Sequence, residues 1–144
     1  MDFKIVIQYN FPSFFNAPMQ ATCPCGSSNT YAACCELFHA NPSLIQTAEQ
    51  LMRARYVGFV LQKTDFLYQT FHPQTRRFQN KQAIAQWSKE NTWQGLEIVK
   101  STAQTVEFKA HYLDKQQEPR VHHEKSIFKM VQKHWFYLNG TILD

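Results

Sequence analysis

The position of the cysteines constrains this chain more than any other feature of its sequence. All four occur between Cys23 and Cys35 as two close pairs, Cys23 with Cys25 and Cys34 with Cys35. A disulfide framework would instead distribute cysteines along the chain to join distant elements. Two close pairs across a short loop allow four thiolates to meet at one ion with tetrahedral coordination. The spacing therefore predicts that these four side chains bind a single metal ion.

The residues around the two pairs fit a tight metal-binding loop. Pro24 stiffens the first pair, and Gly26 allows the chain to turn with a positive φ beneath the metal. We expect Ser27 or Ser28 to cap a short helical turn that carries the second pair, and Tyr31 to shield one side of the site. Zinc is the default metal for four thiolates, and iron is the alternative. Local disulfides or reactive thiols remain a second interpretation of the same residues.

The composition argues against several classes of protein. Hydrophobic residues make up 44% of the chain and charged residues 18%, which is typical of a folded domain. The net charge of +4 is small and the basic residues are scattered, so we do not expect a nucleic-acid partner. The 4 glycines form no nucleotide-binding loop string. No stretch approaches the roughly 18 apolar residues of a membrane span, and we expect a cytoplasmic protein without a membrane partner.

The string CPCGSSNTYAACC, residues 23–35, resembles the SEC-C motif. This short metal-binding module was first known at the end of the SecA translocase. The Cys-Pro-Cys-Gly-Ser start, an aromatic residue in the spacer and the final cysteine pair all match its pattern. The resemblance implies metal binding by the four cysteines, and docking of a protein partner through residues 23–35, which we call the metal knuckle. Uncharged residues replace the lysines of many SEC-C modules, so a basic docking face is missing: Asn29, Thr30, Ala32 and Ala33.

The rest of the chain resembles the YchJ family of bacterial proteins. The matching strings are LMRARY at 51–56, TFHP at 70–73, WQGL at 93–96 and WFYLNGT at 135–141. In that family a SEC-C motif precedes a domain similar to the nuclear-transport-factor-two-like fold, and no biochemical activity is established. Many members carry a second SEC-C copy at the C-terminus. This chain ends at Asp144 without one and is interpreted as a short variant.

These features predict an α+β protein in three parts. Residues 1–18 are an N-terminal extension, residues 19–42 a SEC-C-like metal-binding module, and residues 43–144 a cone-shaped nuclear-transport-factor-two-like domain. Alternating apolar residues in the extension would suit an isolated strand: Phe3, Ile5, Ile7 and Tyr9. Because Met19 stands just ahead of the motif, we hypothesise that it is the natural start and that the extension is not native.

Hydrophobic periodicity predicts helices followed by strands. Apolar spacings of three and four indicate helices at 44–60, 65–71 and 75–89. The second helix ends at His72, because a residue before proline avoids helical angles. A period of two then indicates strands at 96–99, 105–113, 121–132 and 135–142. Short polar turns between the strands predict an antiparallel meander. In the fold of the resemblance, this sheet curves around the helices and a cavity opens between them.

Four polar residues are candidates for a site in that cavity: Arg53, Arg55, Tyr56 and His72. Arg55 lies beside the apolar stripe of its helix, where a guanidinium needs an acceptor. An ion pair with Glu124 and anion binding in the cavity are its two interpretations. For His72 the structural alternative is capping of the last-turn carbonyls of the preceding helix.

The other histidines form no metal-binding string. His122 and His123 are neighbours on a strand, so they point to opposite faces of the sheet. His111 could pair with one of them across strands. Neither H-x-x-x-H nor G-x-S-x-G occurs, so we predict no histidine metal site and no serine nucleophile. We expect the tryptophans to line the core or the cavity: Trp87, Trp93 and Trp135.

Two functions remain open at this point. The favoured one is a zinc-binding protein whose metal knuckle has a structural role and docks a protein partner, because four thiolates leave no coordination position for a substrate. The alternative is small-molecule binding or enzymatic activity in the cavity of the cone domain, with Arg55 and His72 as its polar groups. We favour binding over catalysis, because fold alone does not imply a reaction.

Overall fold

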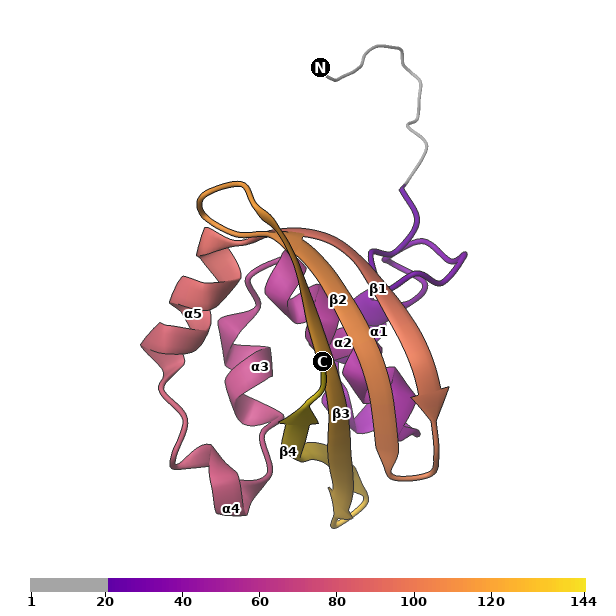
Figure 1. Cartoon of the computed structure of the whole chain (residues 1–144). Coiled ribbons are helices and arrows are strands. Elements are labelled where there is room, and N and C mark those ends of the chain that lie inside the picture. The colour runs from indigo at the N-terminus through magenta and orange to yellow at the C-terminus, as the bar shows by residue number, and fades with distance from the viewer. Residues whose placement is uncertain (1–20) are drawn as a thin grey trace.

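A four-stranded antiparallel sheet curves around the helices of this protein (Figure 1). The computed structural model describes residues 21–144, so the strand expected at residues 3–9 and the start expected at Met19 lie outside the described residues. The strands follow one another in the order of the chain: β1 Thr92–Ser101, β2 Thr105–Leu113, β3 Pro119–Val131 and β4 His134–Ile142. The predicted meander and the α+β class are therefore confirmed.

The register of β2 and β3 determines which side chains face the helices. Phe108 lies opposite Glu124, and Ala110 lies opposite His122. Because side chains alternate along a strand, Ser126 shares the face of Glu124 and His122. This concave face packs against the helices, and Phe128 on the same strand is fully buried. The sheet thus brings a row of polar side chains from β3 into the interior.

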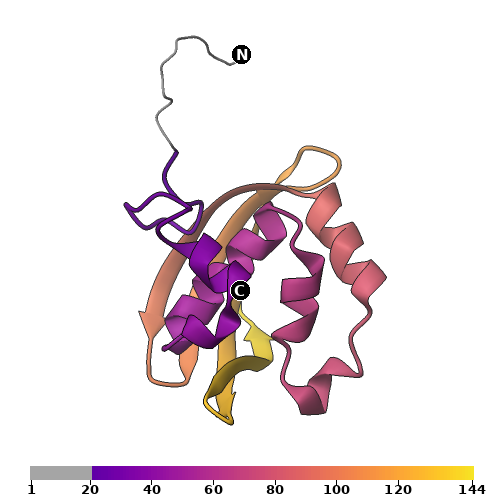
Figure 2. The same cartoon turned by 180° about the vertical axis from the view of Figure 1, so that it is seen from behind.

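Six helical segments of residues 21–144 lie on the concave side of the sheet (Figure 2). They are α1 Cys35–Ala40, η1 Pro42–Leu44, α2 Ala48–Val60, α3 Thr64–Gln69, α4 Pro73–Arg76 and α5 Lys81–Glu90. Helix α2 lies at the centre, and Leu51, Ala54 and Val57 on it are fully buried. It packs against α1, α3 and β1, which explains why its apolar surface extends over several sides.

The predicted start of the central helix at Leu44 is wrong. Residues Pro42–Leu44 form a separate 3-10 turn, and α2 begins only at Ala48. The side chain of Thr47 accepts a hydrogen bond from the backbone N–H of Gln50 at 3.1 Å, which is the contact of an N-cap residue. The cap therefore decides the helix start, although the apolar pattern begins earlier.

The single helix predicted at 75–89 is also wrong, because the chain forms two helices there. Helix α4 ends at Arg76, and α5 begins at Lys81. Asn80 has an extended backbone, and its side chain accepts from the N–H of Ala83 at 3.0 Å. Asn80 therefore begins α5 as its N-cap and ends the helical run that was predicted to continue from residue 75. Among residues 21–144, no helix has both the length and the apolar composition needed to cross a membrane.

Candidate metal centre and central cavity

The structure brings the four cysteine sulfur atoms together at one point. All four Sγ atoms lie within 4.8 Å of one another. The Sγ of Cys34 is 3.6 Å from that of Cys25 and 4.0 Å from that of Cys35. With Zn–S bonds of about 2.3 Å, the sulfurs of a tetrahedral site lie about 3.8 Å apart. The four free thiols therefore have the spacing and the chemistry of a four-thiolate metal site.

Short backbone contacts hold the first cysteine pair in a turn. Gly26 has a φ of +90°, as its sequence position predicts, and its N–H donates to the carbonyl of Cys23 at 3.2 Å. The N–H of Cys23 donates to the carbonyl of Asn29 at 2.7 Å. Neither Ser27 nor Ser28 caps a helix as expected, because α1 begins only at Cys35 and its N-cap position is Cys34. The hydroxyl of Ser27 instead lies 3.3 Å from the Sγ of Cys34.

The pKa values of the thiols favour a cation beside the cluster. A hydrogen bond with Cys35 lowers the pKa of Cys25 to about 4. Burial raises the pKa of Cys23, and the hydrogen bond to Cys25, followed by burial, raises the pKa of Cys35. One thiolate forms readily, whereas further negative charge beside it is unfavourable. A divalent ion would balance that charge and favour release of the remaining protons.

A hydrogen-bonded chain connects the metal knuckle to the central helix. The Nε2 of His39 lies 2.8 Å from the carbonyl oxygen of Ala54, so this nitrogen must donate. The Nδ1 of the neutral ring then accepts from the hydroxyl of Tyr31 at 2.8 Å. Burial lowers the pKa of His39, which favours this neutral form. Sequence reasoning did not identify His39, since a lone histidine carries no spacing signal.

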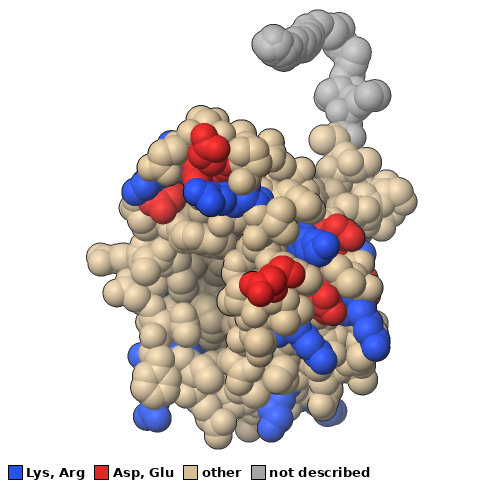
Figure 3. All heavy atoms as spheres, viewed as in Figure 1, with Lys and Arg blue, Asp and Glu red and all other residues tan. Residues whose placement is uncertain are grey.

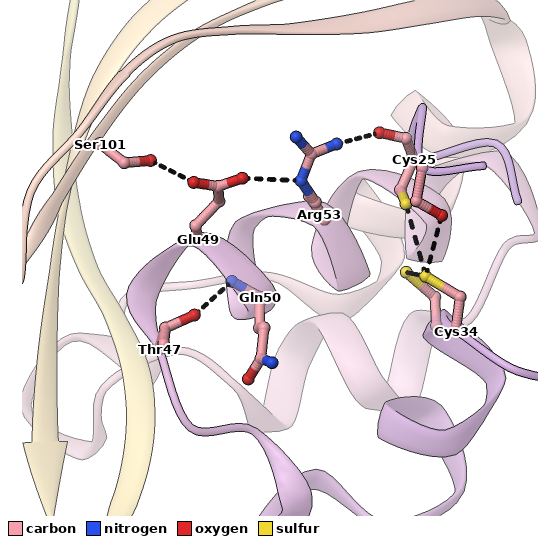
Figure 4. Close-up of polar contacts among 9 residues, drawn as sticks. Cys25, Cys34, Thr47, Glu49, Gln50, Arg53 and Ser101 are labelled. Carbon is pink, nitrogen blue, oxygen red and sulfur yellow. Dashed lines mark hydrogen bonds and ion pairs between the residues drawn. The ribbon is translucent and has the colours of Figure 1, made fainter. Parts of the chain in front are cut away.

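Arg53 lies at this junction and does not line the cavity, contrary to expectation (Figure 4). Its Nη1 donates to the carbonyl of Cys25, and its Nε donates to Glu49 at 2.9 Å. The hydroxyl of Ser101 on β1 donates to the other oxygen of Glu49 at 2.7 Å. Arg53 and Arg55 are separated by about 200° around the helix, so only one of them can face the cavity.

Replacing Arg53 with methionine should loosen the metal knuckle without removing its metal. The variant loses the charge-assisted bonds to Cys25 and Glu49, whereas all four sulfur atoms are retained. We expect amide exchange in residues 23–30 to accelerate about tenfold. Hydrogen-exchange mass spectrometry of the zinc-loaded protein measures this effect. Arg120→Met, which removes an exposed ion pair with Asp114, is the matched control. Equal exchange in both variants would contradict the assigned role of Arg53.

A cavity of about 570 Å³ lies between the helices and the sheet. Of the four predicted cavity residues, Arg55 and Tyr56 line it, whereas Arg53 and His72 do not. Trp87 from α5 and Trp93 from β1 also line the cavity, and their ring centres lie 4.9 Å apart. Trp135 packs against the main core instead. The cavity walls are therefore rich in aromatic rings.

Arg55 is buried, but it makes no direct ion pair with Glu124. Its Nη1 donates to the carbonyl of Leu67 at 2.8 Å and to the hydroxyl of Thr70 at 2.7 Å. Its guanidinium lies 4.5 Å from the ring centre of Phe71 and 4.7 Å from that of Tyr137. Burial lowers the pKa of Arg55 to about 10. Glu124 therefore acts on Arg55 through space, across the tyrosine ring.

His72 caps a helix, but not the one expected. Its Nδ1 accepts from the backbone N–H of Gln74 at 3.1 Å, which caps the start of α4. Pro73 occupies the first position of that helix, where its fixed φ favours initiation. The backbone N–H of His72 donates to the carbonyl of Tyr137 at 2.8 Å and attaches this corner to β4. Its role in this structure is to connect elements outside the cavity.

The polar centre of the cavity is Glu124, on β3. Its Oε1 lies 2.7 Å from Nε2 of His122, and its Oε2 accepts from the hydroxyls of Ser126 and Tyr137, both at 2.6 Å. Burial favours a raised pKa, but these hydrogen bonds outweigh it and hold the pKa of Glu124 below its usual value. The period-two spacing His122, Glu124, Ser126 is the sequence signal that could have identified this row.

The two other candidate histidines lie on the convex face. His123 contacts Glu107 at 2.7 Å, and His111 lies 3.8 Å from Glu97. His122 and His123 therefore point to opposite faces, as predicted. Among the described residues, the partners of His111 and His123 are glutamates, so the structure does not show the pairing considered for His111 with a histidine of β3.

Comparison with known proteins identifies similar sequences for both parts of the chain. Residues 47–140 match the family described as "YchJ, middle NTF2-like domain", and residues 21–37 match the SEC-C motif. A UPF0225 protein of Haemophilus influenzae (strain PittGG) is 35% identical over 135 residues, which cover 90% of this chain and 84% of that protein. A UPF0225 protein of Vibrio vulnificus (strain YJ016) is 40% identical over 129 residues, covering 85% and 76%.

Two solved structures are similar as well. The solution structure of a SEC-C motif containing protein from Rhodopseudomonas palustris has a TM-score of 0.74 at 27% identity. The match covers 88% of this chain and 100% of the Rhodopseudomonas palustris chain. The crystal structure of a SEC-C motif containing protein from Psychrobacter arcticus has a TM-score of 0.67 at 28% identity, covering 85% and 82%. The combination of a cysteine cluster with this fold therefore recurs in other bacterial proteins.

Proposed function

This chain belongs to the YchJ family, which joins a SEC-C motif to an NTF2-like domain, and we propose that it binds zinc in a structural metal knuckle. The observation that supports this most directly is the convergence of four sulfur atoms within 4.8 Å. Four thiolates complete the tetrahedral coordination of zinc and leave no position for water or substrate. The ion would hold the loop in shape, and the chemistry of a catalytic zinc is not expected here.

The burial of the sulfurs supports a structural role. Cys23, Cys25 and Cys35 are almost completely buried, and they belong to the same apolar core as the central helix. Binding of zinc to comparable small modules contributes about 10–16 kcal/mol of apparent free energy that is coupled to folding. In this proposal the protein works in the cytoplasm, where thiols stay reduced and available to the metal.

A second part of the proposal is that the metal knuckle and the adjoining helix α1 present a surface to a protein partner. Leu37 on α1, two residues after the end of the metal knuckle, is 48% exposed. A protein partner fits the charge distribution better than a nucleic acid. Figure 3 shows lysine and arginine mixed with aspartate and glutamate on one face, rather than a patch of one sign.

Metal analysis tests the proposed function. Protein purified under reducing conditions should contain about one zinc per chain by elemental analysis, and Cys25→Ser should contain almost none. Ser28→Ala, in the exposed part of the same loop, is the control and should retain the metal. Iron in place of zinc would be visible as charge-transfer absorption and would correct the metal assignment. Metal-free wild-type protein would overturn the proposal.

The same preparations test docking. Wild-type protein is immobilised on a resin and incubated with a lysate of Haemophilus influenzae. It should retain a partner that the immobilised Cys25→Ser variant does not retain. Leu37→Asp keeps all four thiols, so it should bind zinc normally and still lose the partner. The retained protein, once purified, must bind wild type in a direct assay. Retention that is equal for all three proteins would contradict docking through this surface and leave the zinc proposal intact.

A further inference from the structure

The cavity contains a carboxylate–imidazole pair that the zinc proposal does not use. His122 and Glu124 lie on the concave face of β3, 2.7 Å apart through Nε2 and Oε1. The side chain of Glu124 is only 9% exposed, and that of His122 is 28% exposed and lines the cavity. The carboxylate is thus held in the wall while the imidazole ring borders the open space.

The hydrogen bonds of Glu124 determine the tautomer of His122. Glu124 is ionised and already accepts from Ser126 and Tyr137, so it can only accept from His122. In the neutral form of the imidazole the proton therefore lies on Nε2, and Nδ1 keeps a lone pair. Among residues 21–144, no side chain or backbone group donates to that Nδ1. The neutral ring thus presents a hydrogen-bond acceptor of fixed orientation to the cavity.

Aromatic rings surround this acceptor. The ring of His122 lies 5.8 Å from Trp87 and 6.0 Å from Phe108, between ring centres. Trp87 in turn contacts Phe59 at 5.5 Å and Trp93 at 4.9 Å. All of these rings line the cavity, so its wall offers aromatic contacts to a bound molecule.

The charges in the cavity wall favour an uncharged occupant. Arg55 and Glu124 are the charged residues among those that line it, and their formal charges cancel. Both groups are also already bonded to the protein, Arg55 to Leu67 and Thr70 and Glu124 to three donors. An ion entering the cavity would lose its hydration without gaining a free counter-charge.

We propose that this cavity binds a neutral, flat aromatic molecule, and that Nδ1 of His122 accepts a hydrogen bond from a hydroxyl or N–H group of that molecule. A volume of about 570 Å³ lies within the range of known small-molecule sites. Figure 3 shows that this face of the molecule is hollowed between the helices and the sheet. Phe78, which lines the cavity and is 72% exposed, lies in the segment between α4 and α5.

Two matched probes test the predicted ligand class. The probe 2-naphthol is flat, uncharged at pH 7 and carries a hydroxyl donor, whereas 2-methoxynaphthalene has the same rings without a donor. An NMR titration of the zinc-loaded protein should shift the indole N–H signals of Trp87 and Trp93 with both probes. We expect wild type to bind 2-naphthol about threefold to tenfold more tightly, the value of one neutral hydrogen bond.

Glu124→Gln tests the role of the carboxylate. The amide oxygen can accept from Ser126 and Tyr137 while the amide nitrogen donates to Nε2 of His122, which moves the imidazole proton to Nδ1. Long-range ¹H–¹⁵N spectra should show an unprotonated Nδ1 in wild type and a protonated one in the variant. The preference for 2-naphthol should then disappear. Lys125→Gln, which changes an exposed side chain on the opposite face of β3, is the control and should preserve it.

His122→Phe provides a second test if Glu124→Gln does not fold. The phenyl ring keeps the aromatic wall but removes the acceptor, so the two probes should bind with equal affinity. The proposal is overturned if neither probe shifts the tryptophan signals of wild type, if wild type binds both equally, or if its His122 carries the proton on Nδ1. These outcomes leave the zinc content unchanged, so they are independent of the metal proposal.

Discussion

Replacement of Cys25 by serine is expected to unfold the metal knuckle while the sheet stays folded. The variant removes one of the four proposed metal ligands, and the other buried thiols would lose the cation that favours their ionised form. Backbone contacts within residues 22–30 are few, and the loop lacks a hydrophobic core of its own. Without the metal, little remains to offset the entropy of ordering it.

The expected size of this effect is large and local. Loss of even 4 kcal/mol of the metal's contribution would accelerate amide exchange in residues 23–40 by about a thousandfold. Amides of β2 and β3, which pair along their whole length, should retain most of their protection. Hydrogen exchange measured by NMR checks both parts. Ser28→Ala is the control. Loss of protection throughout the sheet, or unchanged exchange in the loop, would contradict the prediction.

Replacement of Gly140 by alanine is expected to destabilise the protein by about 3 kcal/mol. An added Cβ would lie 1.9 Å from Oε2 of Glu124 and 2.6 Å from its Cδ, so the carboxylate must move. Movement separates Glu124 from the hydroxyls of Ser126 and Tyr137 and leaves a buried charge poorly solvated. Gly95→Ala is the matched control on β1, where an added Cβ meets no atom within 4 Å. Urea unfolding should show a change within about 0.5 kcal/mol for that variant.

The pH dependence of the stability difference between Gly140→Ala and wild type tests whether displacement of Glu124 causes it. The pKa of Glu124 is below its usual value of 4.5 in the folded protein, so its ionisation stabilises the fold above that pH. The contribution is lost as pH falls through the lower, folded-state value. If Gly140→Ala acts by displacing the carboxylate, the stability difference from wild type should shrink in acid. A difference that stays constant with pH would point to a steric effect elsewhere on β4.

Local signals in the sequence were sufficient to predict the cysteine cluster and the order of the strands. The cysteines are close in sequence, so their convergence needs only a glycine turn at Gly26. The strands alternate strictly enough to be read with a period of two. Helix boundaries failed where a single polar side chain overrides an apolar pattern, at Thr47 and at Asn80.

The cavity could not be predicted to the same extent, because its polar centre combines distant segments. Glu124 on β3 depends on Tyr137 from β4 and on the close approach of Gly140. None of these relationships is visible in a local pattern. The position of Arg53 outside the cavity, by contrast, could have been predicted. Residues two apart on a helix point in nearly opposite directions, so Arg53 and Arg55 cannot both face the cavity. This separation follows from the sequence positions alone.

The two regions that are recognised as separate motifs share one interior. Cys23, Cys25 and Cys35 pack in the same core as Leu51 on α2. Arg53 on the same helix donates a hydrogen bond to the carbonyl of Cys25 from outside that core. If the thirteen-residue loop alone were grafted onto another scaffold, its buried cysteines would lose the apolar surface of α2. If the loop were deleted, the apolar surface of α2 that it covers would be exposed to water. For protein engineers, the smallest transferable unit therefore includes the helix as well as the cysteines.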